Sequence, residues 1–121
     1  MNAEIRRADP SRESLTHENC FILELANDSG DPDVSIARAR VLPGVTTEWH
    51  SVRDIDERYV IVAGKGRVEV GNLPATLVSD GDVIRIPANT PQRIQNVGDG
   101  DLVFLAICTP RFVETAYVAG R

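Results

Sequence analysis

The chain has 121 residues, of which 42% are hydrophobic and 26% are charged, and these values are typical of one globular domain with its own core. Its formal net charge is −5, and no basic stripe compensates it, which argues against non-specific binding of nucleic acid. The apolar runs are too short to cross a bilayer and the N-terminus is charged where a signal peptide would be apolar, so we expect a cytoplasmic protein without membrane attachment.

Apolar segments and the turn residues between them predict the elements in chain order. Residues 1–18 are polar and mixed in charge, which predicts an N-terminal arm ahead of a folded domain at residues 19–121. Later segments alternate at period two or are continuously apolar, and Gly, Asn, Asp and Pro separate them. Many short strands with regular turns predict an all-β sandwich or barrel. The expected strands are CFILELAN (20–27), VSIARARV (34–41), TTEWHSV (46–52), ERYVIVAG (57–64), RVEVG (67–71), DVIRIP (82–87), QRIQN (92–96) and DLVFLAIC (101–108).

The two cysteines, Cys20 and Cys108, are far apart in the sequence and lack the close spacing of a zinc knuckle. In a chain without an evident leader, two cysteines are more typical of reduced, buried thiols than of a disulfide. We therefore expect both thiols to be unpaired.

Side-chain alternation within three of the expected strands places polar groups among apolar neighbours on the inward face. Buried polar groups need hydrogen-bond partners, so His50, Glu57 and Gln92 are expected to converge in one pocket. Trp49 falls on the opposite face, where it is expected to pack under the N-terminal arm or against a partner subunit. The inward sets are Thr46, Glu48, His50 and Val52; Glu57, Tyr59, Ile61 and Ala63; and Gln92, Ile94 and Asn96.

Residues 44–64 resemble the first motif of the cupin family, which is Gly, five residues, His-x-His, three or four residues, Glu, six residues and Gly. Gly44 is followed by five residues and His50, and the position of the second His is occupied by Val52. Glu57 comes after four further residues, and Gly64 after another six.

Residues 81–96 resemble the second cupin motif, which is Gly, five residues, Pro-x-Gly, two residues, His, three residues and Asn. Gly81 is followed by five residues and Pro87, and Asn89 stands at the position of the second Gly. Gln92 stands where the family has His, and Asn96 closes the motif. The spacing of both motifs is kept, whereas two of the four metal-binding positions are changed.

The resemblance implies an all-β, single-domain, double-stranded β-helix (jelly-roll barrel), and similarity to its relatives implies a homodimer. Cupins with complete motifs are taken to bind a divalent metal through three His and one Glu. Carried over by position, the metal ligands here are His50, Glu57 and the amide oxygen of Gln92, since Val52 offers no ligand. Such a site would hold Mn, Fe, Ni or Zn with water at the open positions that a catalytic metal needs. Glu48 is an additional candidate oxygen ligand.

Three functions remain open for the pocket, and each involves a small-molecule substrate or ligand. The first is a metal-dependent enzyme with His50, Glu57 and Tyr59 as candidate catalytic residues. Dioxygenase, isomerase and lyase chemistry occur on this scaffold, and nothing in the sequence selects among them. The second is a metal-free binding module that senses or sequesters a small metabolite. The third is metal-free acid–base catalysis by the His50–Glu57 pair on a sugar-like or keto-acid substrate.

Overall fold

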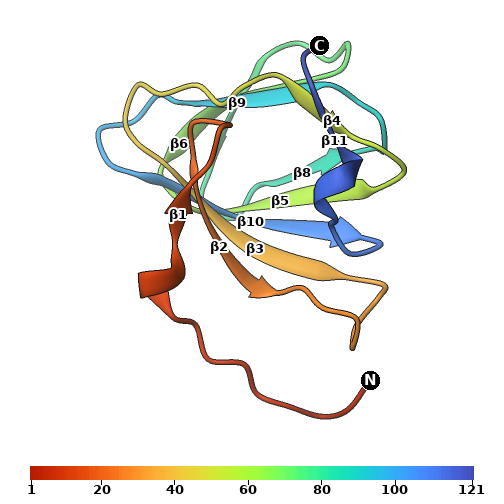
Figure 1. Cartoon of the computed structure of the whole chain (residues 1–121). Helices are drawn as coiled ribbons and strands as arrows, with labels where there is room; N and C mark the ends of the chain where they lie inside the picture. The colour runs from red at the N-terminus through yellow and green to blue at the C-terminus, as the bar shows by residue number, and fades with distance from the viewer.

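The computed structural model describes residues 1–121 and confirms the predicted all-β architecture, in which two antiparallel sheets face each other (Figure 1). The larger sheet has six strands. Its long strand at Leu102–Thr109 pairs with one strand on each side, and each pairing extends over most of the neighbouring strand. In spatial order these strands are β1 (Ser14–Leu15), β2 (Phe21–Ala26), β3 (Ser35–Val41), β10 (Leu102–Thr109), β5 (Asp56–Ala63) and β8 (Val83–Ile86).

The smaller sheet has five strands and covers the opposite side of the core (Figure 1). Two short 3₁₀ helices, η1 (Pro10–Arg12) and η2 (Glu114–Ala116), are the only helical turns, and neither has the length or the apolar character of a membrane-crossing helix. In spatial order the strands of this sheet are β11 (Tyr117–Ala119), β4 (His50–Val52), β9 (Gln92–Asn96), β6 (Lys65–Val70) and β7 (Thr76–Ser79).

The core lies between the sheets and is made by the alternating inward side chains of the strands. In β5 every second residue from Glu57 to Ile61 is buried, and in β9 the buried residues are the first, third and fifth. The inward set predicted for β9 is therefore confirmed, and that for β5 is confirmed from Glu57 to Ile61, whereas Ala63 is only half-buried. The main apolar cluster contains Cys20, Ala39, Val41, Tyr59, Ile61, Val68, Val70, Ile84, Ile86, Ile94, Leu102 and Phe104.

The turns explain two positions of the sequence motifs. Gly64 has φ +96°, and a Cβ atom at this position would lie 2.7 Å from the carbonyl oxygen of Asp101, so only glycine fits. Asn89 has φ +66°, a left-handed conformation that asparagine tolerates better than most residues do. Asparagine can therefore replace the motif glycine there without changing the turn that leads into β9.

The last part of the N-terminal segment pairs with the larger sheet, and Arg6 in its early part forms an ion pair with Asp28 after β2. Residues 1–9 have no regular secondary structure and trail away from the barrel (Figure 1). Strand β1 then pairs with β2, and the Arg40 guanidinium binds the Glu13 carboxylate at 2.6 Å. Two residues of the predicted arm thus belong to the sheet as β1, and the boundary at residues 18 and 19 stays a prediction.

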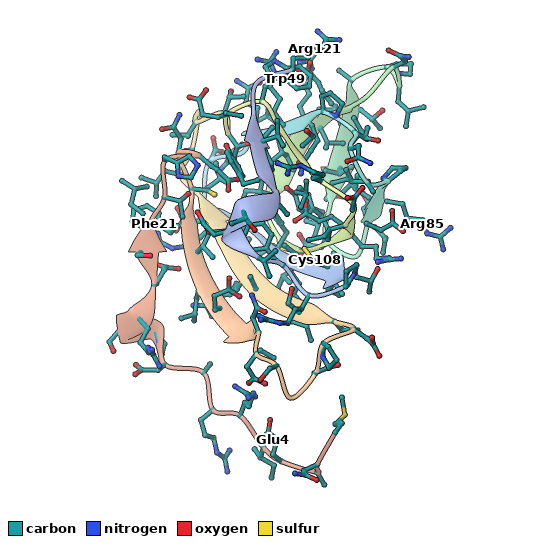
Figure 2. All side chains as sticks on the ribbon, turned by 45° about the vertical axis from the view of Figure 1, so that its right-hand side comes forward. Glu4, Phe21, Trp49, Arg85, Cys108 and Arg121 are labelled. Atoms are coloured by element: carbon teal, nitrogen blue, oxygen red, sulfur yellow. The ribbon has the colours of Figure 1, made fainter.

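Trp49 points away from the core, as predicted, and two guanidinium groups pack against its ring. The guanidinium carbon of Arg93 is 4.5 Å from the centre of the indole ring and that of Arg121 is 4.7 Å away. Figure 2 shows Trp49 and Arg121 together at one end of the molecule, far from Glu4 in the N-terminal segment. Two arginines therefore pack on this ring, and its expected contact with the N-terminal arm or a partner subunit stays a prediction.

Candidate functional site

A pocket of about 690 Å³ lies inside the barrel against the inner face of the larger sheet. Strands β2, β3, β5 and β10 form most of its wall, and the β1–β2 turn, β4, η2 and β11 complete it. His50, Glu57 and Tyr59 line the pocket, and Gln92 is fully buried next to them. The volume is within the range of small-molecule sites.

His50 is the first residue of β4 and its side chain is buried. The ring Nδ1 lies 2.9 Å from the carbonyl oxygen of Glu48. A carbonyl oxygen only accepts hydrogen bonds, so Nδ1 carries the proton in this arrangement. The other ring nitrogen, Nε2, is then a hydrogen-bond acceptor that faces the polar groups of the pocket.

Gln92 connects His50 to Glu57 through one amide group. Gln92 is the first residue of β9 and is paired with His50 across the sheet. Its amide nitrogen Nε2 lies 3.0 Å from His50 Nε2 and donates to Glu57 Oε1 at 2.7 Å. The predicted convergence of these three side chains is confirmed, and a single NH₂ group makes both contacts.

Tyr59 fixes the orientation of that amide. Its hydroxyl donates to Gln92 Oε1 at 2.7 Å, so the oxygen end of the amide is already bound. Burial, followed by the nearby Glu57 charge, raises the pKa of Tyr59 well above its ordinary value, which keeps the hydroxyl protonated as a donor. The ring packs on Phe104 at 4.3 Å between ring centres. Tyr59 is thus a positioning residue for Gln92.

Glu57 is the most strongly desolvated carboxylate of the pocket, with 8% of its surface exposed. Its pKa is raised to about 7, mainly by burial; the charge of Glu18 adds to this shift, whereas His50 and the hydrogen bonds from Cys108 and Gln92 oppose it. The second oxygen, Oε2, has a single long contact of 3.6 Å to the Cys108 thiol. Glu57 therefore changes its protonation state near neutral pH.

Glu18 belongs to the pocket, although the sequence placed it at the end of a polar arm. It lies in the turn between β1 and β2, and its Oε2 is 3.5 Å from His50 Nε2. Burial raises the pKa of its carboxyl, and the nearby histidines oppose this shift. The only signal in the sequence was "LTHENC" itself, a polar turn directly before the first apolar strand.

The rings of His50, Tyr117 and His17 contact one another in this order at the end of the pocket where His50 lies. The Tyr117 ring stacks on His50 with 5.1 Å between the ring centres. His17 meets the Tyr117 ring edge-on at 4.7 Å. His17 is exposed, and its ring lines this side of the pocket.

Glu48 does not lie in the pocket, so its candidacy as an oxygen ligand is corrected. Its side chain is exposed and accepts a hydrogen bond from Asn19 Nδ2 at 2.9 Å. The prediction assumed regular alternation from Thr46 to Val52, but β4 begins only at His50. The side chains of residues 46–49 therefore need not alternate between the two faces of the sheet as strand residues do. Only the backbone carbonyl of Glu48 reaches the site.

The arrangement of the predicted ligands does not fit a divalent metal. Gln92 directs its NH₂ group, which has no lone pair to offer, toward His50 and Glu57, and its oxygen is bound by Tyr59. Val52 is apolar, and no three His, Cys, Asp or Glu side chains converge as a ligand set. Coordination by the Gln92 oxygen would require the amide to turn over and give up its present hydrogen bonds.

Comparison with known proteins places this geometry in a family. A family model described as a cupin domain matches residues 37–108. The uncharacterized protein MJ1618 of Methanocaldococcus jannaschii is 31% identical over 106 residues, which cover 86% of this chain and 84% of the relative.

Among solved structures, a protein from Klebsiella pneumoniae with a double-stranded β-helix domain covers 98% of this chain and 99% of its own, with a TM-score of 0.79 and 13% identity. Oxalate decarboxylase from Bacillus subtilis, whose Mn(II) centres have been studied, has a TM-score of 0.78 and 24% identity. Its match covers 91% of this chain and 30% of the decarboxylase. These structural matches show the fold alone. The family model matches more than half of the chain, and the relative from M. jannaschii is 31% identical to it. The chain therefore belongs to the cupin family.

Proposed function

We propose that this cupin is a small-molecule-binding protein whose pocket works without a bound metal. The observation that carries the proposal is the Gln92 amide nitrogen, which lies within hydrogen-bonding distance of both His50 and Glu57. These are the two side chains that retain the family's ligand positions. No buried side-chain polar atom of the protein lacks a hydrogen-bond partner, so the polar cluster is complete without an ion.

The lining of the pocket supports a ligand with both polar and apolar parts. The walls include Ile22, Ala39 and Phe104, whereas His50 and Glu57 present polar groups at one end. Ligand sites combine mainly apolar walls with a few placed polar groups in this way. The polar end would fix the orientation of the ligand, and the walls would supply most of the buried area.

A second candidate function, metal-free acid–base catalysis, is favoured by the pKa of Glu57. Burial brings this pKa to about 7, where one carboxyl can both accept and release a proton at neutral pH. His50 would be the second proton-transfer group, and Tyr59 would act through Gln92. A loss of turnover in Glu57→Gln with retained ligand binding would separate catalysis from binding.

The binding proposal is tested by NMR titration of a fragment library in the presence of a chelator. Binding fragments are expected to shift resonances of His50 and Tyr117. Ala106→Phe fills the pocket and should abolish these shifts, whereas Ala75→Phe, at an exposed residue outside the pocket, should leave them unchanged. Fragments that bind only after addition of Mn²⁺ or Zn²⁺ would overturn the metal-free proposal.

The homodimer expected from the family resemblance stays a proposal, and the free edges of the two sheets support it. Leu77 on edge strand β7 is 72% exposed and Val83 on edge strand β8 is 58% exposed. Apolar side chains on open sheet edges favour association with a second chain. Light scattering should give twice the 13.2 kDa mass of one chain, and Leu77→Lys should lower it to that of a monomer.

A further inference from the structure

The charged groups that line the pocket are mainly acidic. Two of the carboxylates lie in the interior next to His50, and the other two are exposed and lie nearer to solvent. They come from four different parts of the chain, namely the β1–β2 turn, β2, β5 and η2. These residues are Glu18, Glu24, Glu57 and Glu114.

No lysine lines the pocket, and its two arginines do not neutralise the interior carboxylates. Arg6 and Arg12 both belong to the exposed N-terminal segment. The Arg6 guanidinium is already paired with the carboxylates of Glu4 and Asp28. The interior of the pocket therefore contains two acidic groups and no fixed cationic side chain.

Both interior carboxylates have an oxygen without a strong hydrogen-bond donor. Glu57 is more than nine-tenths buried and lines the pocket, yet its Oε2 contacts only the Cys108 thiol, a weak donor, at 3.6 Å. Glu18 Oε2 lies 3.5 Å from His50 Nε2, and this nitrogen already faces the Gln92 amide. Desolvated carboxylate oxygens favour a ligand that brings its own N–H donors.

Aromatic rings surround the same space. Phe104 and Tyr59 pack together at 4.3 Å on the side of the larger sheet, and Phe112 and Tyr117 line the pocket from the C-terminal segment. The faces of aromatic rings carry negative charge density and attract cations, most strongly where water is excluded. Carboxylates and aromatic rings thus favour the same kind of ligand.

We infer that the pocket binds a small organic cation, a primary ammonium group attached to an apolar body. The inference rests on the proposed binding function and names its ligand class. The ammonium group donates to the Oε2 atoms of Glu18 and Glu57, whose present contacts are long, and the apolar body lies against the rings of Tyr59, Phe104 and Tyr117. A ligand carboxylate or phosphate in this position meets two desolvated carboxylates and no interior cationic side chain.

The inference is tested with three probes that share one carbon skeleton and differ in the head group. These are 3,3-dimethylbutylamine, 3,3-dimethylbutan-1-ol and 3,3-dimethylbutanoate, which are cationic, neutral and anionic at pH 7.5. NMR titration of each compound into the protein measures its affinity and locates it through the resonances of His50 and Tyr117. The amine should bind at least about fivefold more tightly than the alcohol, and the carboxylate should bind most weakly.

Each of the other outcomes counts against a defined part of the account. Equal affinities for amine and alcohol, or tighter binding of the carboxylate, would overturn the cation inference but leave a small-molecule pocket in place. If none of the three compounds shifts the pocket resonances, both the inference and the proposed binding function fail. The titrations with the three compounds therefore distinguish failure of the cation inference from failure of the proposed binding function.

A variant pair assigns the preference to the pocket carboxylates. Glu18→Gln keeps the size of the side chain in a turn, removes its charge, and should reduce the affinity for the amine about threefold to tenfold while leaving the alcohol unaffected. Glu69→Gln is the control because this carboxylate lies on the outer face, paired with Arg93 at 3.1 Å. An equal loss in both variants would mean that the preference reflects net charge alone, and would overturn the inference.

Discussion

Tyr59 donates its hydroxyl proton to the amide oxygen of Gln92 over 2.7 Å, and this contact decides what the amide offers to the pocket. With the oxygen bound, the NH₂ end faces His50 and Glu57. The same glutamine with its amide reversed would present an oxygen, which is a metal ligand. The orientation set by Tyr59 therefore separates a hydrogen-bonded cluster from a coordination site.

Tyr59→Phe should destabilise the protein by about 1–3 kcal/mol, because it leaves the buried oxygen of Gln92 without its donor. Urea unfolding measures the change. Tyr117→Phe is the matched control, since the Tyr117 hydroxyl takes part in none of the hydrogen bonds of the cluster, and it should cost less than about 0.5 kcal/mol. Equal stabilities of Tyr59→Phe and wild type would show that the amide orientation does not depend on the hydroxyl.

Glu57 should make the protein less stable as the pH rises from about 4.5 to about 7. The folded carboxyl holds its proton up to about pH 7, whereas the unfolded one releases it at about 4.5, so the folded state binds more protons in this window. Its contribution to the free energy of unfolding falls by roughly 2–3 kcal/mol between pH 5 and pH 8. Groups facing Glu57 are His50 from β4, Glu18 from the β1–β2 turn, Cys108 from β10 and Gln92 from β9.

The measurement is urea unfolding of wild type and Glu57→Gln at pH 5 and pH 8. Glutamine keeps an acceptor for Gln92 and does not titrate, so the difference in stability between the two pH values should be smaller in the variant by roughly 2–3 kcal/mol. Other carboxyls whose pKa is lowered, such as Glu13, contribute equally to both proteins and cancel. Identical pH dependence in both proteins would contradict the raised pKa of Glu57.

Gln92→His should create a metal site that the wild-type cluster does not provide. The substitution adds an imidazole at the β9 position next to His50 and Glu57, which gives two histidines and one carboxylate. Imidazole binds Zn²⁺ and Ni²⁺ far better than an amide does, so affinity should rise by at least about tenfold, with little change for Mg²⁺. Adding His50→Ala should remove the gain. Unchanged affinity in Gln92→His would mean that the barrel no longer supports coordination at these strand positions.

Both cysteines should react slowly in the folded protein and fully after unfolding. Cys20 and Cys108 are free and buried, and burial raises the pKa of each thiol, to about 12 for Cys20. Thiol titration without reductant should report two sulfhydryls in denaturant. Fewer than two in denaturant, or fast reaction of both in the native protein, would contradict the free, buried state.

The sequence predicted best the part of the site that lies on regular strands. Glu57 and Tyr59 on β5 and Gln92 on β9 follow the two-residue period, so their shared inward direction was readable before their contacts were known. The motif spacing also placed Asn89 at a glycine position, and the structure shows the left-handed conformation that explains this exchange. Local periodicity and turn chemistry depend on residues that are neighbours in the chain, so they can be predicted directly from the sequence.

The remainder of the site depends on contacts between distant or irregular segments. Glu18 reaches His50 from a turn, where no period assigns a direction, and Glu48 fails because the strand begins two residues later. The orientation of the Gln92 amide depends on the Tyr59 hydroxyl, 33 residues away in the chain. Hydrogen-bond geometry in the folded barrel determines these side-chain orientations, and the spacing of motif residues in the sequence does not predict them.

The most direct test of the metal-free cluster is calorimetric titration of untagged, chelator-treated wild-type protein with Mn²⁺ and with Zn²⁺ at pH 7.5. The bridging amide of Gln92 predicts no saturable binding tighter than about 1 mM, because His50 and Glu57 alone supply too few donors. The same titration of His50→Ala shows whether any observed binding belongs to this site. Binding of one ion per chain in the micromolar range, lost in His50→Ala, would contradict the account and restore the metal-dependent reading of the pocket.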